Sequence, residues 1–77
     1  MIDGESMKIN CNNYQTKEII RFMRESTDKT QKEFAYDVNK TREWCAAVEG
    51  GKSNVLLKDF IELANINNIK ITMSKEK

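Results

Sequence analysis

Side chains that could carry acid–base, nucleophilic or metal chemistry are scarce in this sequence. It has no histidine, which removes the commonest general base, and its two cysteines, Cys11 and Cys45, lie in no recognisable nucleophile motif. Without histidine or a CxxC pair, a structural zinc site lacks its usual ligands. Two cysteines are also too few for a disulfide framework. The sequence therefore predicts that the protein is not an enzyme and that it uses no cofactor and no metal.

The chemistry that remains is hydrogen bonding and charge pairing, and the charges nearly balance. The 77 residues include 13 Lys and Arg and 12 Asp and Glu, which gives a net charge of +1. Such a balance supports a nucleic-acid partner only if the cations gather on one face. No apolar stretch approaches the roughly 20 residues that span a bilayer, and the N-terminus lacks the pattern of a secretory signal. We therefore expect a cytoplasmic protein that does not associate with a membrane.

Helices must position these side chains, because helix breakers are rare and apolar residues recur at helical spacing. The chain has no proline and only three glycines. The spacing predicts helices over about residues 16–26, 30–39, 41–49 and 55–65. A chain of this length forms one domain with a small core. We predict a mainly α fold, namely a compact bundle of four to five helices.

Residues 30–51 carry the clearest local signals. Thr30 and Glu33 have the spacing of a capping box, which starts a helix. Asn39 tolerates the left-handed conformation that ends a helix, and Thr41 can cap the helix that follows. Two consecutive glycines then end this second helix. Two helices joined by a turn of about three residues form a helix-turn-helix.

The two ends of the chain show different patterns. Residues 1–6 lack periodicity and predict a flexible extension, and residues 75–77 predict a solvated tail, which leaves residues 7–74 as a single domain. Residues 7–11 and 69–74 alternate apolar and polar side chains, as is typical of strands. These two strands could pair with each other as a small two-stranded β ribbon. Alternatively, the C-terminal strand could pair across a dimer axis.

Four residues carry a spacing that is specific for one family. Gln31 is followed by Ala35 four residues later, by Glu49 eighteen residues later and by Gly51 twenty residues later. Further matching residues are Arg24, Thr30, Lys32, Glu33, Phe34, Val38, Asn39, Thr41, Cys45, Val48, Leu57, Phe60 and Ala64. Over about residues 18–66 the chain thus resembles the Cro/repressor-type (XRE-like) helix-turn-helix DNA-binding family. The resemblance implies a repressor-like bundle with its helix-turn-helix at residues 30–51.

The resemblance also implies which residues touch DNA. The helix 41–49 would lie in the major groove, with base contacts from Arg42, Glu43, Ala46 and Ala47. Arg42 can bind guanine O6 and N7, and Glu43 can accept a hydrogen bond from a cytosine amino group. Contacts to the DNA backbone are expected from Gln31, Lys32, Lys40, Thr41, Lys52, Ser53 and Asn54. The alternative for Arg42 and Glu43 is an ordinary solvated role on the helix surface.

Other positions match the family pattern less well or have a structural role. Arg24 and Glu49 match a pair that forms a salt bridge between helices, the alternative being two independent solvated charges. Lys29 and Lys40 stand where the family usually has apolar residues, which predicts a thinner core around the turn. Trp44 is unusual on such a helix. It could pack sideways over Lys40 or the loop, contact DNA, or belong to a protein interface.

Two functions of different classes follow from these residues. The first is a sequence-specific DNA-binding transcriptional regulator, a phage- or mobile-element-like repressor, that binds a palindromic operator in double-stranded DNA as a homodimer. Its half-sites would be separated by about 34 Å, one helical turn of DNA. The alternative is a protein-interaction module, or an antitoxin-like protein with a protein partner, that uses the same shape with weak or no DNA binding. Trp44 and the near-neutral charge support this alternative.

Overall fold

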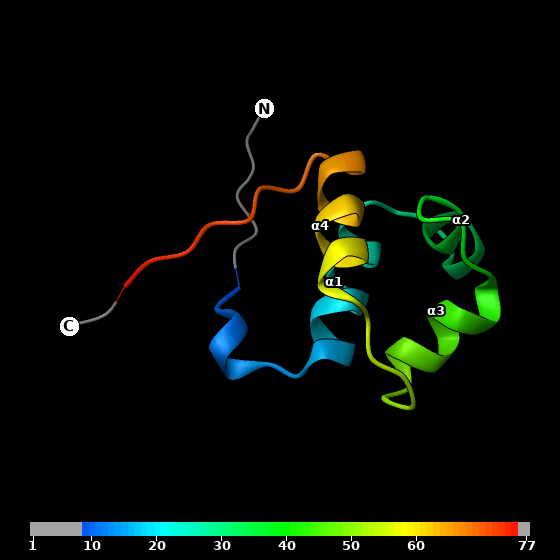
Figure 1. Ribbon diagram of the computed structural model, residues 1–77, viewed down its shortest axis with the longest axis horizontal. Coiled ribbons are helices and arrows are strands. Elements are labelled where there is room, and N and C mark those ends of the chain that lie inside the picture. Colours follow the sequence, from blue (N-terminus) through cyan, green and yellow to red (C-terminus); the bar gives the residue numbers. More distant parts are fainter. Residues whose placement is uncertain (1–8, 76–77) are drawn as a thin grey trace.

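The computed structural model describes residues 9–75, and every regular element in that range is helical. The elements are the 3-10 turn η1 (Cys11–Asn13) and the helices α1 (Thr16–Ser26), α2 (Gln31–Tyr36), α3 (Arg42–Glu49) and α4 (Leu57–Ile66). The prediction of a mainly α fold is therefore confirmed. Figure 1 shows α2 and α3 together on one side of α1 and α4. None of the helices in residues 9–75 is long and apolar enough to cross a bilayer.

Side-chain caps start α2 and α3, the two helices of the predicted helix-turn-helix. The Thr30 hydroxyl accepts a hydrogen bond from the Glu33 backbone N–H at 3.1 Å, and the Glu33 carboxylate accepts one from the Thr30 N–H at 2.9 Å. This reciprocal pair is the capping box that the sequence predicts. At the start of α3, the Thr41 hydroxyl accepts a hydrogen bond from the Trp44 N–H at 3.2 Å. Both caps fix where their helices begin, and therefore which side chains occupy the first turns.

The turn between α2 and α3 closes on a left-handed residue. Asn39 has a φ of 60°, as predicted from its tolerance of that conformation. The Lys40 N–H then reaches back to the Ala35 carbonyl at 2.9 Å, which satisfies a carbonyl at the end of α2. Asp28 and Asn68 adopt the same conformation after α1 and α4, with φ of 59° each. Side chains with short polar groups thus end three of the four helices.

The hydrophobic core collects side chains from all four helices. Phe34 and Ala35 of α2 are fully buried, and α2 packs against α3, which in turn packs against α1. The absence of a larger side chain at Ala35 allows the two helices to approach closely. The other buried apolar residues are Ile20, Met23, Val38, Cys45, Val48, Leu63 and Ala64. Because α3 is held from two sides, its outer face has a fixed orientation.

The predicted β ribbon is absent from residues 9–75, so that prediction is wrong for the described part of the chain. Residues 7 and 8 lie outside the described residues. After Ile9 the chain bends into η1, because the Asn10 side chain accepts a hydrogen bond from the Asn12 N–H at 3.0 Å and so competes with a strand ladder. Residues 69–75 form no strand, and an isolated two-stranded ribbon is marginal in water. The predicted extension at residues 1–6 also lies outside the described residues.

Candidate nucleic-acid interface

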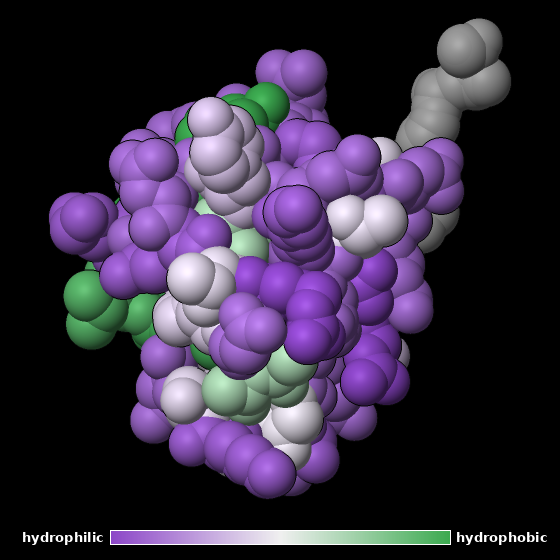
Figure 2. Space-filling model, turned by 90° about the vertical axis from the view of Figure 1, so that its right-hand side faces the viewer, coloured by the Kyte–Doolittle hydropathy of each residue, from purple (hydrophilic) through white to green (hydrophobic). Residues whose placement is uncertain are grey.

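The four residues predicted to read bases lie on the outward side of α3. The side chains of Arg42 and Glu43 are 56% and 76% exposed, and they form an ion pair with an Nη2–Oε2 distance of 3.3 Å. Ala46 and Ala47, one turn further on, are half-buried. Figure 2 looks at the side of the molecule on which α2 and α3 lie, and this face is largely hydrophilic, with weakly hydrophobic patches near its middle and more strongly hydrophobic side chains at its left and upper edges. The structure therefore offers a short polar surface with two charged groups at its start.

Trp44 lies between these exposed side chains and the core. It is half-buried and packs against the hydrophobic core. The ring therefore has a packing role against the core. This contact helps to hold the first turn of α3 in place while Arg42 and Glu43 point outward.

The predicted contacts to a DNA backbone lie at the starts of α2 and α3 and in the loop after α3. At the start of α2, Lys32 is exposed, but the Gln31 side chain is half-buried and its Nε2 donates to Glu49 Oε1 at 3.2 Å. Before α3, the Lys40 ammonium lies 3.9 Å from Asp59 Oδ2, and the Thr41 hydroxyl caps the helix. The loop residues Lys52, Ser53 and Asn54 are all exposed. Gln31 and Lys40 thus have internal partners, which the sequence did not indicate.

The buried carboxylate of Glu49 joins three helices. Its side chain is 2% exposed and accepts hydrogen bonds from Arg24 Nε at 2.6 Å and from Arg24 Nη2 at 3.1 Å. The Gln31 Nε2 donates a hydrogen bond to Glu49 Oε1, and the Cys45 Sγ lies 3.3 Å from Glu49 Oε2. Arg24 also donates to the Lys29 carbonyl at 3.0 Å. The predicted Arg24–Glu49 salt bridge is therefore present, and it connects α1 to the end of α3 and the start of α2.

The pKa values in this network follow from burial and hydrogen bonding. Burial by itself would raise the pKa of Glu49, but the hydrogen bonds from Arg24, Gln31 and Cys45 outweigh it and lower the pKa below its usual range. The hydrogen bond with Glu49 raises the pKa of Arg24. Burial, together with the hydrogen bond to Glu49, raises the pKa of Cys45 to about 12. At neutral pH the network therefore contains a carboxylate, a guanidinium and a neutral thiol.

A lowered pKa makes the contribution of Glu49 to stability depend on pH. The carboxylate stabilises the fold above the unfolded-state pKa of about 4.3, and this contribution is lost as the pH falls through the lower pKa of the folded state. We expect urea denaturation followed by circular dichroism to give a free energy of unfolding that declines below about pH 5. Glu49→Gln should be less stable at pH 7 and should show a shallower decline. Parallel declines in the two proteins would contradict this assignment.

Two further carboxylates pair with Lys29 and Lys40, the lysines that stand where the family resemblance predicts apolar residues. Lys29 Nζ lies 2.7 Å from Asp37 Oδ2, and Asn67 Nδ2 donates to the same oxygen at 3.1 Å. Lys40 faces Asp59, whose side chain is 5% exposed. The sequence did not identify Asp37 and Asp59 as the partners of these lysines. The only available signal was the pair of lysines at apolar positions, and nothing in the spacing indicates which acidic residues lie opposite them.

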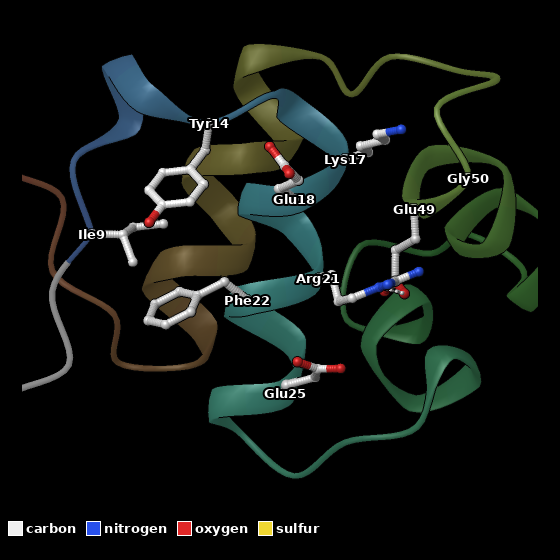
Figure 3. A pocket seen from close by; sticks show the side chains of 9 residues that line it. All are labelled: Ile9, Tyr14, Lys17, Glu18, Arg21, Phe22, Glu25, Glu49 and Gly50. Carbon is white, nitrogen blue, oxygen red and sulfur yellow. Dashed lines mark ion pairs between the residues drawn. The ribbon is translucent and has the colours of Figure 1, made fainter.

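A shallow groove of about 730 Å³ runs along α1 (Figure 3). At one end gather the apolar side chains of Ile9, Tyr14 and Phe22, and at the other end Arg21 points toward Glu49. The remaining lining residues are Lys17, Glu18, Glu25 and Gly50. Acidic and basic groups alternate along it, and residues 9–75 contain no cluster of three side chains that could hold a metal ion. The groove therefore lacks the converging polar groups of a small-molecule site.

The α2–α3 face can bind a polar surface that forms hydrogen bonds. It presents a guanidinium and a carboxylate side by side at the start of α3, small side chains one turn later, and exposed lysines on either side. Comparison of the chain with protein-family models, with curated proteins and with solved structures gave no match.

Proposed function

We propose that this protein is a sequence-specific DNA-binding transcriptional regulator, acting as a repressor in the cytoplasm, whose helix-turn-helix places α3 in the major groove. The observation that carries the proposal is the pair Arg42 and Glu43, exposed on the first turn of a helix whose opposite side is anchored in the core. The first residues of such a helix are the ones that reach base edges. The resemblance to the Cro/repressor-type (XRE-like) family supports the same arrangement.

Base recognition would come from four side chains of α3. The Arg42 guanidinium can donate two parallel hydrogen bonds to guanine O6 and N7. The Glu43 carboxylate can accept one from a cytosine amino group. Ala46 and Ala47 can contact thymine methyl groups or permit close approach of the helix. The ion pair between Arg42 and Glu43 is exposed and therefore weak, so it can open at little cost when bases replace it.

Backbone contacts would position α3 in the groove without reading sequence. The exposed Lys32, Lys52, Ser53 and Asn54 are free to approach phosphates at the two ends of the face. Gln31 has donated one amide hydrogen to Glu49, which leaves its second amide hydrogen for a phosphate oxygen. Lys40 and Thr41 complete the set at the start of α3. With few excess cations, a single subunit would bind with modest affinity.

A homodimer on a palindromic operator would supply the missing affinity, because linking two binding events raises the effective concentration of the second. The C-terminal segment supports this part of the proposal. Ile71 and Met73 are 45% and 92% exposed, so the segment carries apolar side chains that a second copy could cover. Half-sites would lie about 34 Å apart if the dimer is symmetric. Analytical ultracentrifugation with and without the operator duplex measures this state directly.

Selection of bound sequences from a pool of random duplexes tests the proposed function. We expect enrichment of one inverted-repeat sequence, with binding that weakens as salt increases. Enrichment of no sequence would remove the claim of sequence specificity. Binding without any dependence on ionic strength would contradict the phosphate contacts.

Arg42→Ala is the substitution that reports base reading most directly. We expect it to weaken binding to the selected operator by about 1–3 kcal/mol and to relax specificity at one base pair, because the lost contact is to a single guanine. Fluorescence anisotropy with the operator and its single-base variants measures both effects. Arg21→Ala is the matched control, since Arg21 is also 56% exposed but lies on α1. An equal loss in both variants would mean that only net charge matters.

A protein-interaction module is the second candidate, and two observations favour it. Glu43 stands beside Arg42 and cancels its charge in the middle of the face that should attract phosphates. Leu56 and Leu57, which follow the loop after α3, are 63% and 71% exposed and could contact an apolar partner. An antitoxin-like protein would combine both roles. In the selection experiment this candidate predicts no enrichment of a DNA sequence.

A further inference from the structure

A buried carboxylate that the proposed contacts do not use, Asp59, lies near Lys40 in the turn before α3. Asp59 is in the first turn of α4, and its side chain is 5% exposed. Lys40 Nζ is 3.9 Å from Asp59 Oδ2, and Lys58 Nζ is 3.6 Å from Asp59 Oδ1. Both distances exceed those of N–H···O hydrogen bonds. The carboxylate is thus held near two ammonium groups by charge rather than by hydrogen bonds to them.

The charge of Asp59 affects the ammonium groups of the two lysines to different extents. The Lys58 side chain is 78% exposed and projects from α4, where solvent screens its charge. The Lys40 side chain is 38% exposed and comes from the turn that leads into α3. Burial of Asp59 reduces that screening, so its charge acts more on the partly shielded ammonium of Lys40 than on that of Lys58. Lys40 is also one of the residues placed beside the DNA backbone.

We propose that Asp59 restrains DNA binding by neutralising Lys40, so that Asp59 and a DNA phosphate compete for the same ammonium group. The proposal rests on the proposed function, since it requires a duplex at the start of α3. Asp59 touches no DNA in this arrangement and acts only through Lys40, as a positioning residue. Its effect is to lower the number of cations that the protein offers to phosphates, and hence the salt dependence of binding.

Asp59→Asn tests the competition, because it removes the charge while keeping the shape of the side chain. With a mixed-sequence duplex, we expect the slope of log K against log salt concentration to become steeper by about 0.9, the value for one more neutralised phosphate. The ratio of the variant's affinity to that of the wild type should then be larger by a factor of about 3.5 at about 50 mM than at about 200 mM salt. Glu62→Gln removes the same charge from an exposed position of α4 and should leave the slope unchanged.

Lys40→Met supplies the second arm of the experiment. In the Lys40→Met background, Asp59→Asn should have no effect on DNA affinity, because the two residues then no longer interact. By itself, Lys40→Met should weaken binding less than Lys52→Met, since Lys40 is already neutralised. Circular dichroism confirms that each variant is folded at the temperature of the titration.

Three results would overturn the proposal while leaving DNA binding intact. They are an unchanged slope for Asp59→Asn, an equal effect of Glu62→Gln, and an effect of Asp59→Asn that persists without Lys40. A wild-type protein that binds no duplex at any salt concentration would instead overturn the proposed function, and this inference with it. The two failures are therefore distinguishable from the wild-type titration alone.

Discussion

Arg24→Ala is expected to lower the free energy of unfolding by about 3–5 kcal/mol, because it leaves the carboxylate of Glu49 buried without its main partner. The Glu49 side chain is 2% exposed. Its carboxylate accepts two hydrogen bonds from the Arg24 guanidinium, at 2.6 and 3.1 Å. A loss of this size is a large share of the stability of a small domain. Urea denaturation at pH 7, followed by circular dichroism, measures it.

Arg21 provides an internal control for that result. Its Nε lies 3.6 Å from the same carboxylate, but its side chain is 56% exposed. Arg21→Ala should therefore cost less than about 1 kcal/mol, as is typical of exposed ion pairs. If both substitutions had similar small effects, the buried pair would contribute no more than a surface pair, and Glu49 would have to be solvated in solution.

Phe34→Ala is expected to have an effect of similar size through a different cause. Phe34 is the largest fully buried side chain, and it lies in α2, which packs against α3. Removing the ring loses its transfer free energy and leaves a cavity, which together cost about 3–5 kcal/mol. The midpoint of urea denaturation should fall, while the slope with denaturant stays the same.

Tyr36→Ala removes an aromatic ring of similar size from the end of the same helix. Tyr36 is 77% exposed, so its loss should change the free energy of unfolding by no more than about 0.5 kcal/mol. A large effect of Tyr36→Ala would show that the ring is buried in solution, for example against a second copy of the chain. The comparison therefore separates the core of the monomer from any surface used in association.

Local signals explain which parts of the fold could be predicted from the sequence. The capping box at Thr30 and Glu33 and the left-handed turn at Asn39 depend on residues within three positions of each other and on backbone conformation. The conformation of these two segments therefore depends little on the rest of the chain. The Arg24–Glu49 pair spans 25 residues and was predicted only because a family resemblance placed the two positions together.

The features that the sequence did not predict correctly also have a physical explanation. Alternation of apolar and polar residues predicts a strand only when a partner strand is present, and residues 69–75 have none within the described chain. Asp37 and Asp59 were missed because pairing in space follows from how α4 packs, which spacing alone does not reveal. Gln31 was assigned to DNA, and its bond to Glu49 shows that one side chain can serve both the core and a candidate surface.

Because the first turn of α3 is exposed, its residues could be replaced during evolution at little cost to folding. Arg42 and Glu43 pair with each other and are each more than half exposed, so replacing them should barely alter the free energy of folding. Arg24 and Glu49, by contrast, hold the helices together and leave little room for substitution. In the proposed arrangement, base recognition and folding thus depend largely on different residues, Arg42 and Glu43 for the first and Arg24 and Glu49 for the second. A lineage could therefore acquire a new binding preference in single mutational steps, each of which leaves the fold intact.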